Sequence, residues 1–481
     1  MNFIKPVAPS VSWRTGILFV LGSAACFHLA YAPDPIAPVP WMTAMYLILL
    51  AQLARLKTTR LSFYFGLSTG MLCVAPQLVC FWNIFGMAAV PLWFVLALWI
   101  AGFVALAHVV LHRFGVKWAL VLIPFLWTGL EYFRSEFYYL RFSWMNVGFA
   151  FAESHPISLH AFGMYGIGFL AAILAAFSLA TRWSYSVALV AALIIADPFF
   201  NSNLTSTATQ KGTLRIAGIQ MEFPAADEIP IALDQVVAGF PEADLIVLSE
   251  YTLDGPVPED LKNWCRRNHR YLIVGGKDPA PQQQFYDSAF VVDPTGAIVF
   301  KQAKSVPIQF FKDGLPAPKQ ELWASPWGRI GICICYDLSY TRVTDRLAKL
   351  GAQLLIVPTM DVADWGRHQH ELHALVAPVR AAEYHLPIFR LASSGISQAV
   401  DSTGRVVARA QFPGQNEILF AELSSPERGS LPLDRILALV SVGITGLTIL
   451  ALVVATRKNQ RRSAPTSSPV KTQTVSDLSD V

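Results

Sequence analysis

Long apolar runs fill most of the first 200 residues, and one more lies near the C-terminal end. They occur at about 15–33, 38–54, 60–82, 87–111, 118–133, 159–181 and 185–200, and then at 433–456. Each run approaches the roughly 20 residues that a helix needs to cross a bilayer, although the second, fifth and seventh are short. The pattern predicts about seven membrane helices before a polar segment and one helix after it.

The pattern changes between about 206 and 425, where short β-branched runs alternate with helical stretches. The runs are 214–220, 244–250, 271–276, 288–293, 330–337, 352–359 and 387–393. Alternating strands and helices predict a layered α/β sandwich. We therefore expect a transmembrane domain at 1–205, an α/β domain at 206–425, a transmembrane helix at 426–457 and a disordered cytoplasmic tail at 458–481.

Composition and loop charge support a membrane protein with a defined orientation. With 54% hydrophobic and 15% charged residues, the chain is too apolar for a soluble enzyme of 481 residues. Lys and Arg gather in alternate loops, which predicts that both termini are cytoplasmic and the polar domain lies outside. The net charge of +4 comes without a basic patch interleaved with aromatic residues, so we expect no nucleic-acid partner.

One loop, at about 134–157, does not follow this charge rule. We expect its basic residues to pair with acidic neighbours at the surface or to contact lipid headgroups; the residues concerned are Arg134, Arg141, Glu131, Glu136 and Glu153.

Three predicted strands of the polar domain are followed by residues that suit nucleophilic catalysis. Glu250 ends one run, Lys304 follows another, and Cys335 ends a third. A thiol needs a base to become a nucleophile, a carboxylate can serve as that base, and an ammonium can stabilise the oxyanion that forms. Each residue taken alone is more often structural, so the spacing by itself leaves this triad a weak hypothesis.

Other residues offer little support for a metal or a cofactor. Cys333 and Cys335 are too close for ordinary disulfide geometry, and no second pair lies at zinc spacing. His370 and His373 lack the carboxylate of a zinc-protease motif, so we interpret them as helix-surface or loop-anchoring residues. No phosphate-binding glycine loop is evident, and we expect neither cofactor nor metal.

The motifs of the polar domain resemble those of the nitrilase superfamily. They comprise A-G-I-Q at 217–220, L-S-E ending at Glu250, G-I-C-I-C-Y-D around Cys335, P-T-M-D at 358–361, R-A-A-E at 380–383 and the segment 393–405. The resemblance implies a four-layer αββα sandwich with Glu250, Lys304 and Cys335 as its catalytic residues. Cys335 precedes Tyr336 and Asp337 as the nucleophile of that family does, and Cys333 is then expected in the core.

The membrane segments resemble, within that superfamily, the apolipoprotein N-acyltransferase family. Residues 81–86, F-W-N-I-F-G, resemble its aromatic loop, and Phe142-Ser143-Trp144 with Gly148 resembles a second signature. The resemblance implies a monomeric enzyme of the bacterial inner membrane with a periplasmic catalytic domain. It would transfer an acyl chain from a membrane phospholipid, through a thioacyl-cysteine, to the N-terminal diacylglyceryl-cysteine of an apolipoprotein.

Two departures from the family pattern leave alternatives open. Strict counting from Val306-Pro307 puts Gln302 at the lysine position, and we favour Lys304 over Lys301. Phe310 stands where the family has a glutamate, with Asp313 as a tentative substitute. These changes favour the alternative of a membrane-tethered amidase or nitrilase-type hydrolase.

The roles of some neighbouring residues also stay open. Asp337 could orient the turn around Cys335, steer an amine or be structural. Trp264, Trp365 and Phe310 could contact acyl chains or could pack in the core.

Overall fold

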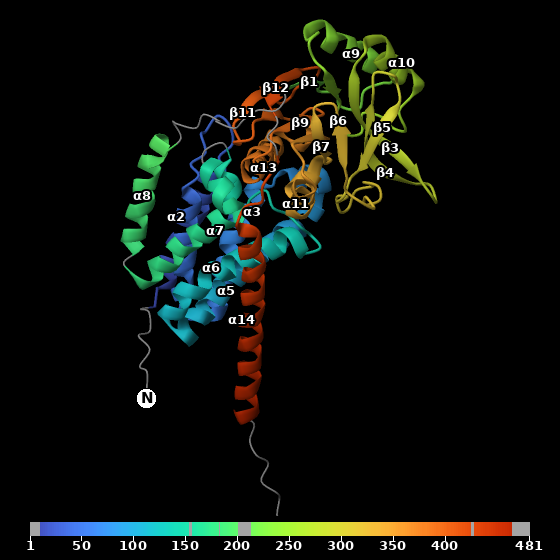
Figure 1. Ribbon diagram of the computed structural model, residues 1–481. Helices are drawn as coiled ribbons and strands as arrows, with labels where there is room; N and C mark the ends of the chain where they lie inside the picture. Colours follow the sequence, from blue (N-terminus) through green and yellow to red (C-terminus); the bar gives the residue numbers. More distant parts are fainter. Residues whose placement is uncertain (1–9, 153–155, 182, 201–212, 425–427, 464–481) are drawn as a thin grey trace, which may run out of the picture.

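The computed structural model describes residues 10–152, 156–181, 183–200, 213–424 and 428–463, and it has a helical part and an α/β part (Figure 1). The long helix α14 runs away from the α/β part along the helical part, and α8 lies at the opposite flank. The predicted boundary near 201–211 lies outside the described residues, as does most of the predicted tail, of which 458–463 belong to α14.

The helices of the first part coincide with the predicted apolar runs. They are α1 (Trp13–Ala30), α2 (Met42–Gln52), α3 (Thr59–Gln77), the short α4 (Cys80–Phe85), α5 (Ala89–Phe114), α6 (Val116–Tyr132), α7 (Pro156–Ala180), α8 (Trp183–Phe200) and α14 (Asp434–Ser463). Among the described residues, five helical segments are long and apolar enough to cross a membrane: 13–30, 80–114, 116–137, 158–180 and 434–457. The apolar helices at 42–55 and 183–196 are shorter, so the number of about eight spans is not confirmed.

Small residues allow the helices to pack closely. A Cβ added at Gly70 of α3 would lie 2.7 Å from the Cα of Ala97 in α5, and one at Gly129 of α6 would lie 2.5 Å from the carbonyl oxygen of Ser441 in α14. Close approach of backbones through glycine is typical of helix contacts in lipid, where packing rather than the hydrophobic effect holds helices together.

The α/β part contains two six-stranded sheets, in the orders β12-β1-β2-β3-β4-β5 and β11-β10-β9-β8-β7-β6. The first contains β1 (Thr213–Ile219), β2 (Leu245–Val247), β3 (Tyr271–Ala280), β4 (Gln284–Val292), β5 (Ile298–Ala303) and β12 (Ile418–Ser424). The second contains β6 (Leu322–Ser325), β7 (Gly328–Ile332), β8 (Leu354–Thr359), β9 (Ile388–Ala392), β10 (Ser397–Val400) and β11 (Val406–Ala410). Strands β1-β2-β3 and β7-β8-β9 pair in parallel, and the other pairs are antiparallel.

Helices cover the outer face of each sheet. Alternate residues of β1 show this, because Ile219 packs in the cluster with α9 (Glu228–Gly239) and α10 (Glu259–Asn268), whereas Ile216 packs in the core between the sheets. Helix α13 (Val376–Tyr384) covers the second sheet, near α11 (Thr341–Leu350) and after α12 (Arg367–Ala374). The predicted αββα layering is therefore observed.

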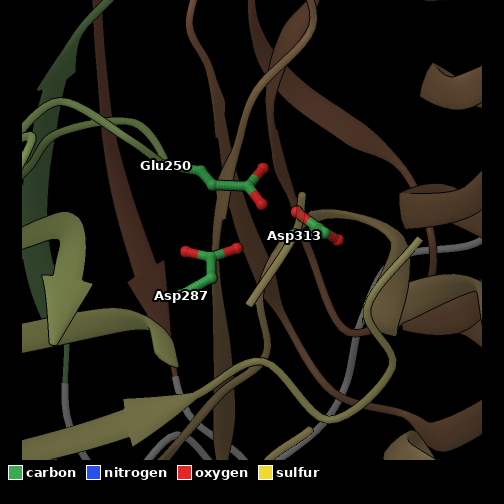
Figure 2. Close-up of side chains that lie close together, drawn as sticks. All are labelled: Glu250, Asp287 and Asp313. Atoms are coloured by element: carbon green, nitrogen blue, oxygen red, sulfur yellow. The ribbon is translucent and has the colours of Figure 1, made fainter. Parts of the chain in front are cut away.

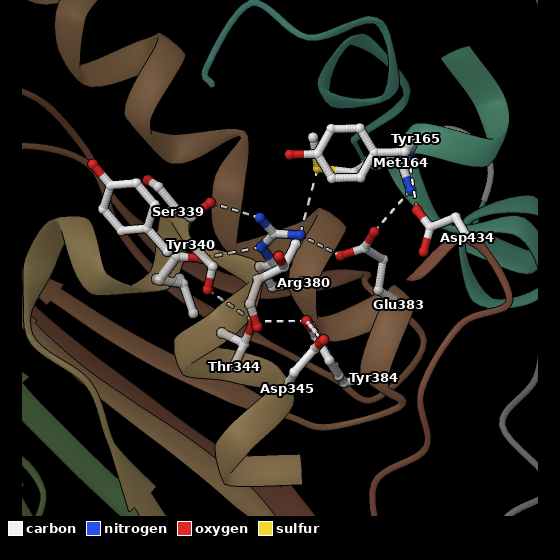
Figure 3. A network of polar contacts seen from close by, with 12 residues as sticks. Met164, Tyr165, Ser339, Tyr340, Thr344, Asp345, Arg380, Glu383, Tyr384 and Asp434 are labelled. Carbon is white, nitrogen blue, oxygen red and sulfur yellow. Dashed lines mark hydrogen bonds and ion pairs between the residues drawn. The ribbon is translucent and has the colours of Figure 1, made fainter. Parts of the chain in front are cut away.

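A buried ionic network joins the two parts (Figure 3). Arg380 of α13 donates to the carbonyl oxygens of Leu338 (3.0 Å) and Ser339 (2.7 Å), which lie in the turn that follows β7. Glu383, one turn along α13, pairs with Arg380 and accepts the backbone N–H of Met164 in α7 at 2.7 Å. The network thus ties the α/β part to helix α7.

Helix α14 joins the same network through Arg435. Its guanidinium lies 3.2 Å from Glu383 and 2.9 Å from Asp345, and it also pairs with Asp434. Because Met164 of α7 and Arg435 of α14 both contact Glu383, the α/β part is fixed to α7 and α14 together.

The prediction of surface pairs in the loop at 134–157 is wrong for its buried members, Glu131, Arg134 and Glu136; Glu153 lies outside the described residues. Glu131 accepts the backbone N–H of Val147 at 3.0 Å, and Glu136 accepts that of Thr341 at 2.9 Å. The carboxylates are buried because irregular backbone between the two parts needs hydrogen-bond partners that no helix supplies.

Candidate active site

Three segments from the two facing sheets bring Glu250, Lys304 and Cys335 together. Glu250 follows β2, Lys304 follows β5 and Cys335 follows β7, and all three are buried. The Nζ atom of Lys304 lies 2.7 Å from Oε1 of Glu250. Two of the residues predicted from the motifs therefore form a direct ion pair.

Met360, directly after β8, links the carboxylate to the thiol. Its backbone N–H donates to Oε2 of Glu250 at 2.7 Å, and its carbonyl oxygen accepts from Sγ of Cys335 at 3.7 Å. One peptide segment therefore holds the thiol and the carboxylate side by side.

Cys335 opens a tight turn, Cys335–Ser339, which we call the elbow. Its φ of 50° lies in the left-handed region that residues other than glycine rarely adopt. Strain of this kind persists only where surrounding contacts enforce it, and it is common at reactive residues. Cys333, two residues earlier, is fully buried in the core as predicted.

Asp337 fixes the elbow to the loop that carries Lys304. Its carboxylate accepts the backbone N–H groups of Ser305 and Val306, both at 2.8 Å, and that of Ile334 at 3.3 Å. Of the roles left open for Asp337, these contacts correspond to orienting the elbow.

Two further carboxylates face Lys304. Its Nζ atom lies 2.8 Å from Asp313 and 3.5 Å from Asp287, and Figure 2 shows both side chains pointing with Glu250 toward one point. Asp313 also accepts the hydroxyl of Tyr251 at 2.9 Å. Asp313 was the tentative substitute for the missing glutamate, whereas Asp287 was missed; the signal for it was a charged residue inside the apolar strand β4.

The carboxylates of Glu250, Asp287 and Asp313 are close enough to be a metal site, since their oxygens lie within 4.8 Å of one another. The ammonium of Lys304 lies within 3.5 Å of all three. A divalent cation there would sit against that positive charge, so the donor set fits the lysine better than a metal.

Burial and charge set the protonation of the site. Burial alone would lower the pKa of Lys304, but Glu250 and Asp313 raise it well above its usual value. Burial would raise the pKa of Glu250, but Lys304 and hydrogen bonds lower it below its usual value. Burial and then the charge of Glu250 raise the pKa of Asp287 and of Cys335 well above their usual values. These directions favour an ammonium on Lys304 and a carboxylate on Glu250, so Glu250 is the group placed to accept the thiol proton.

Lys301, the alternative lysine, lies away from this cluster. Its side chain is 57% exposed and pairs with Asp278 at 2.5 Å. Only Lys304 of the two can contact a group bound at Cys335.

An apolar cavity that is open to the outside reaches Cys335. One wall comes from α4, α5 and the loop before α7, and includes Phe81, Ile84, Phe85, Leu96, Phe142 and Trp144. The other wall contains Phe310 and Trp365, while Trp264 is buried in the distant core beside α9. Both segments that resembled acyltransferase signatures therefore lie at this cavity.

Of the two interpretations of His370 and His373, the helix-surface one is wrong, because both are buried, whereas the contact of His373 with Asp361 in the loop after β8 corresponds to the loop-anchoring one. His373 lies in the cavity wall, with Nδ1 at 2.8 Å from Oδ1 of Asp361. The ring of His373 lies against Trp144 and against Arg390 of β9, which are tertiary contacts that the local pattern does not encode.

Comparison with known proteins supports these observations. The family model "Carbon-nitrogen hydrolase" matches residues 187–432, just over half of the chain, and "Apolipoprotein N-acyltransferase N-terminal domain" matches residues 23–177. The apolipoprotein N-acyltransferase of Geobacter metallireducens is 23% identical over 82% of this chain and 86% of its own length. That of Haemophilus ducreyi is 24% identical over 90% of this chain and 94% of its own length.

Matches to the α/β part alone are also found. Human deaminated glutathione amidase is 28% identical over 36% of this chain and 60% of its own length. A solved carbon-nitrogen hydrolase from Helicobacter pylori has 20% identity and a TM-score of 0.39, covering 44% of this chain and 89% of that one. The resemblance expected from the motifs is confirmed over both parts, in agreement with the prediction of an acyltransferase. The chain belongs to the carbon-nitrogen hydrolase family, and its helical part is similar to that of the apolipoprotein N-acyltransferases.

Proposed function

We propose that the protein acts as an apolipoprotein N-acyltransferase. It moves an acyl chain from a membrane glycerophospholipid to the α-amine of the N-terminal diacylglyceryl-cysteine of lipoproteins. The observation that carries this proposal is the apolar cavity at Cys335, because half of its wall comes from the helical part. A chain of methylene groups gains about 0.8 kcal/mol for each CH₂ that leaves water, so such a wall favours an acyl chain over a small polar amide.

In the first half-reaction the phospholipid ester acylates Cys335. Glu250 accepts the thiol proton, and the thiolate attacks the ester carbonyl, where Lys304 and a backbone N–H stabilise the oxyanion. The C–O bond then breaks, Glu250 returns the proton to the leaving oxygen, and a lysophospholipid departs. The acyl chain remains as a thioester on Cys335.

In the second half-reaction the acceptor amine attacks this thioester. The new C–N bond forms, the C–S bond breaks, and Glu250 carries a proton from nitrogen to sulfur. The products are the N-acylated lipoprotein and the free thiol, so the cycle needs no cofactor.

The location proposed for this reaction is the outer surface of the bacterial inner membrane. Both termini would be cytoplasmic, and the α/β domain at about 206–425 would be periplasmic. The protein would be a monomer with a transmembrane domain at 1–205 and a transmembrane helix at 426–457. Support comes from the apolar helices and from the alternation of Lys and Arg between loops. Both substrates are lipids, and a site at that surface lets them enter without leaving the bilayer.

A hydrolase is the second candidate, favoured by the similarity of the α/β part to amidases and by Phe310 in place of a glutamate. Water would then resolve the acyl-enzyme. Asp313 argues for the transferase, because its carboxylate lies 2.8 Å from Lys304 and can replace the glutamate that is absent at Phe310.

The test is a reaction of the full-length protein in phospholipid vesicles with a synthetic diacylglyceryl lipopeptide, followed by mass spectrometry. The proposal expects a mass gain of one acyl chain on the lipopeptide. Release of free fatty acid with an unmodified lipopeptide would instead support the hydrolase.

A further inference from the structure

The cavity at Cys335 contains a second group with the geometry of a base. His373 of α12 is 2% exposed and lies in the cavity wall, and its Nδ1 atom is 2.8 Å from Oδ1 of Asp361. The other carboxylate oxygen of Asp361 accepts from Arg390 of β9 at 2.5 Å. A buried carboxylate that holds one nitrogen of an imidazole directs the other nitrogen toward its reaction partner.

The imidazole ring is also held by its face. The ring of Trp144 stacks on it at 4.5 Å between centroids and 18° between planes. Trp144 is itself fixed, because its Nε1–H donates to the hydroxyl of Ser339 in the elbow at 3.0 Å. His373 is therefore oriented relative to the same turn that carries Cys335.

The hydrogen bonds favour a proton on Nδ1 and a lone pair on Nε2. Arg390 also lies 2.9 Å from Nδ1, but it already donates to Asp361 and to the carbonyl oxygen of Ile396. Hydrogen bonds to an ionised carboxylate are the stronger kind, so Nδ1–H donates to Asp361. Nε2 has no hydrogen-bond partner in the part of the chain that the structure describes.

The proposed reaction needs such a second base. An α-amine has a pKa of about 7.7–8.0 and is mostly an ammonium at neutral pH. It must lose one proton before it attacks and another afterwards, whereas an attacking water is already neutral. Both oxygens of Glu250 are engaged, with Lys304 and with Met360, and this carboxylate carries one proton at a time.

We propose that His373, oriented by Asp361, accepts the first proton from the acceptor's α-ammonium in the second half-reaction. This inference rests on the proposed function and assigns a further catalytic residue to it. Nε2 takes the proton, and the neutral amine attacks the thioester carbonyl of acyl-Cys335. The C–N bond forms, the C–S bond breaks, Glu250 moves the second proton from nitrogen to sulfur, and His373 releases its proton to solvent through the open cavity.

The surroundings keep His373 neutral at physiological pH. Burial lowers its pKa, Asp361 raises it, and Arg390 and His370 lower it, so the pKa stays below its usual value. Apart from Asp361, the other titratable groups in the cavity wall are Cys80, Arg141, Cys335 and Tyr336. The neutral imidazole of His373 predominates above its lowered pKa. The rate of acyl transfer to an amine should therefore fall as the pH drops through that pKa.

The experiment separates the two half-reactions in full-length protein reconstituted in vesicles. Release of lysophospholipid from a fluorescent donor measures acylation, and addition of the lipopeptide measures transfer, at pH 7 and pH 9. For His373→Asn we expect acylation within about twofold of wild type and transfer at pH 7 lower by about sixfold to tenfold, because only about a tenth to a sixth of an amine with a pKa of about 7.7–8.0 is neutral at that pH. At pH 9 the lipopeptide amine is neutral in solution, so most of the transfer should return.

His108→Asn is the matched control, a buried histidine of α5 that lies outside the cavity wall and contacts Ser62 and Ala54 rather than Asp361. Any loss it causes through packing should be the same at both pH values. If His373→Asn slows acylation as much as transfer, loses equal activity at both pH values, or leaves transfer unchanged, the inference is wrong. If wild type releases only fatty acid, the proposed function fails as well, and with it the need for a second base.

Discussion

At the scale of single residues, the site depends on one buried ammonium. Lys304 is 1% exposed, yet it faces Glu250, Asp313 and Asp287 within 3.5 Å. A buried cation is stable only when its charge is compensated, and here the compensating carboxylate is Glu250, the residue proposed as the catalytic base. The same ammonium lowers the pKa of Glu250 and, in the proposed reaction, stabilises the oxyanion formed at Cys335.

Lys304→Met should therefore reduce acylation far more than Lys301→Met, its matched control. We expect Lys304→Met to lower the acylation rate by about 10²-fold or more, since it removes an oxyanion donor and leaves Glu250 unpaired. The exposed Lys301 should be replaceable with little effect on rate. Equal losses in the two variants, measured by lysophospholipid release, would contradict the assignment of Lys304.

At the scale of elements, the elbow is fixed by α13 and, through it, by α7 and α14. The carbonyl oxygens of Leu338 and Ser339 are satisfied by Arg380, and Arg380 is compensated by Glu383. Glu383 also contacts Met164 of α7 and Arg435 of α14. One carboxylate therefore supports both helices and, through Arg380, the elbow (Figure 3).

Glu383→Gln should strongly destabilise the protein. It leaves Arg380 and Arg435 as undercompensated buried cations, a change that costs about 3–5 kcal/mol. Glu259→Gln breaks surface pairs in which the glutamate side chain is 60% exposed, and it should leave the stability nearly unchanged. Thermal unfolding in detergent measures the Tm of both variants. Similar Tm values would show that the network around Glu383 does not stabilise the protein.

Close helix packing gives a second test at this scale. Gly70→Ala would bring a Cβ to 2.7 Å from the α5 backbone at Ala97, whereas Gly102→Ala meets nothing within 4 Å. Overpacking of this kind costs about 1–3 kcal/mol. We expect a lower Tm for Gly70→Ala and an unchanged Tm for Gly102→Ala; the same Tm for both would argue against the α3 and α5 contact.

At the scale of the whole molecule, the two parts build the cavity jointly. Neither the sheets nor the helices alone enclose Cys335, since α4 and α5 face Phe310 and Trp365 across it. In the proposed reaction the helical part therefore contributes to the binding of substrate as well as to anchoring.

Filling the cavity from the membrane side should select against long acyl chains. Ile84→Trp adds bulk to the wall, so we expect acylation by a long-chain donor to fall about tenfold while a short-chain donor is affected little. Ile17→Trp, at a position of α1 that is 42% exposed, is the control and should leave both rates unchanged. An equal loss for both chain lengths with Ile84→Trp would mean that the acyl chain lies elsewhere.

How far the sequence predicts this molecule depends on the range of the interaction. Strand-end motifs indicated Glu250, Lys304 and Cys335, and apolar runs indicated the helices, because both signals are local. Asp287 was missed because its partners lie 37 and 17 residues away along the chain, at Glu250 and Lys304. Glu136 was placed at the surface because its partner, the N–H of Thr341, is 205 residues distant.

The central claim, a thioester on Cys335, is tested most directly by mass spectrometry of the protein itself after incubation with phospholipid vesicles lacking an acceptor. We expect one added acyl chain on the peptide that contains Cys335, in wild type and in Cys333→Ala, and none in Cys335→Ala. The adduct should disappear when the lipopeptide is added. An acyl adduct that persists in Cys335→Ala, or full transfer activity in that variant, would contradict the account.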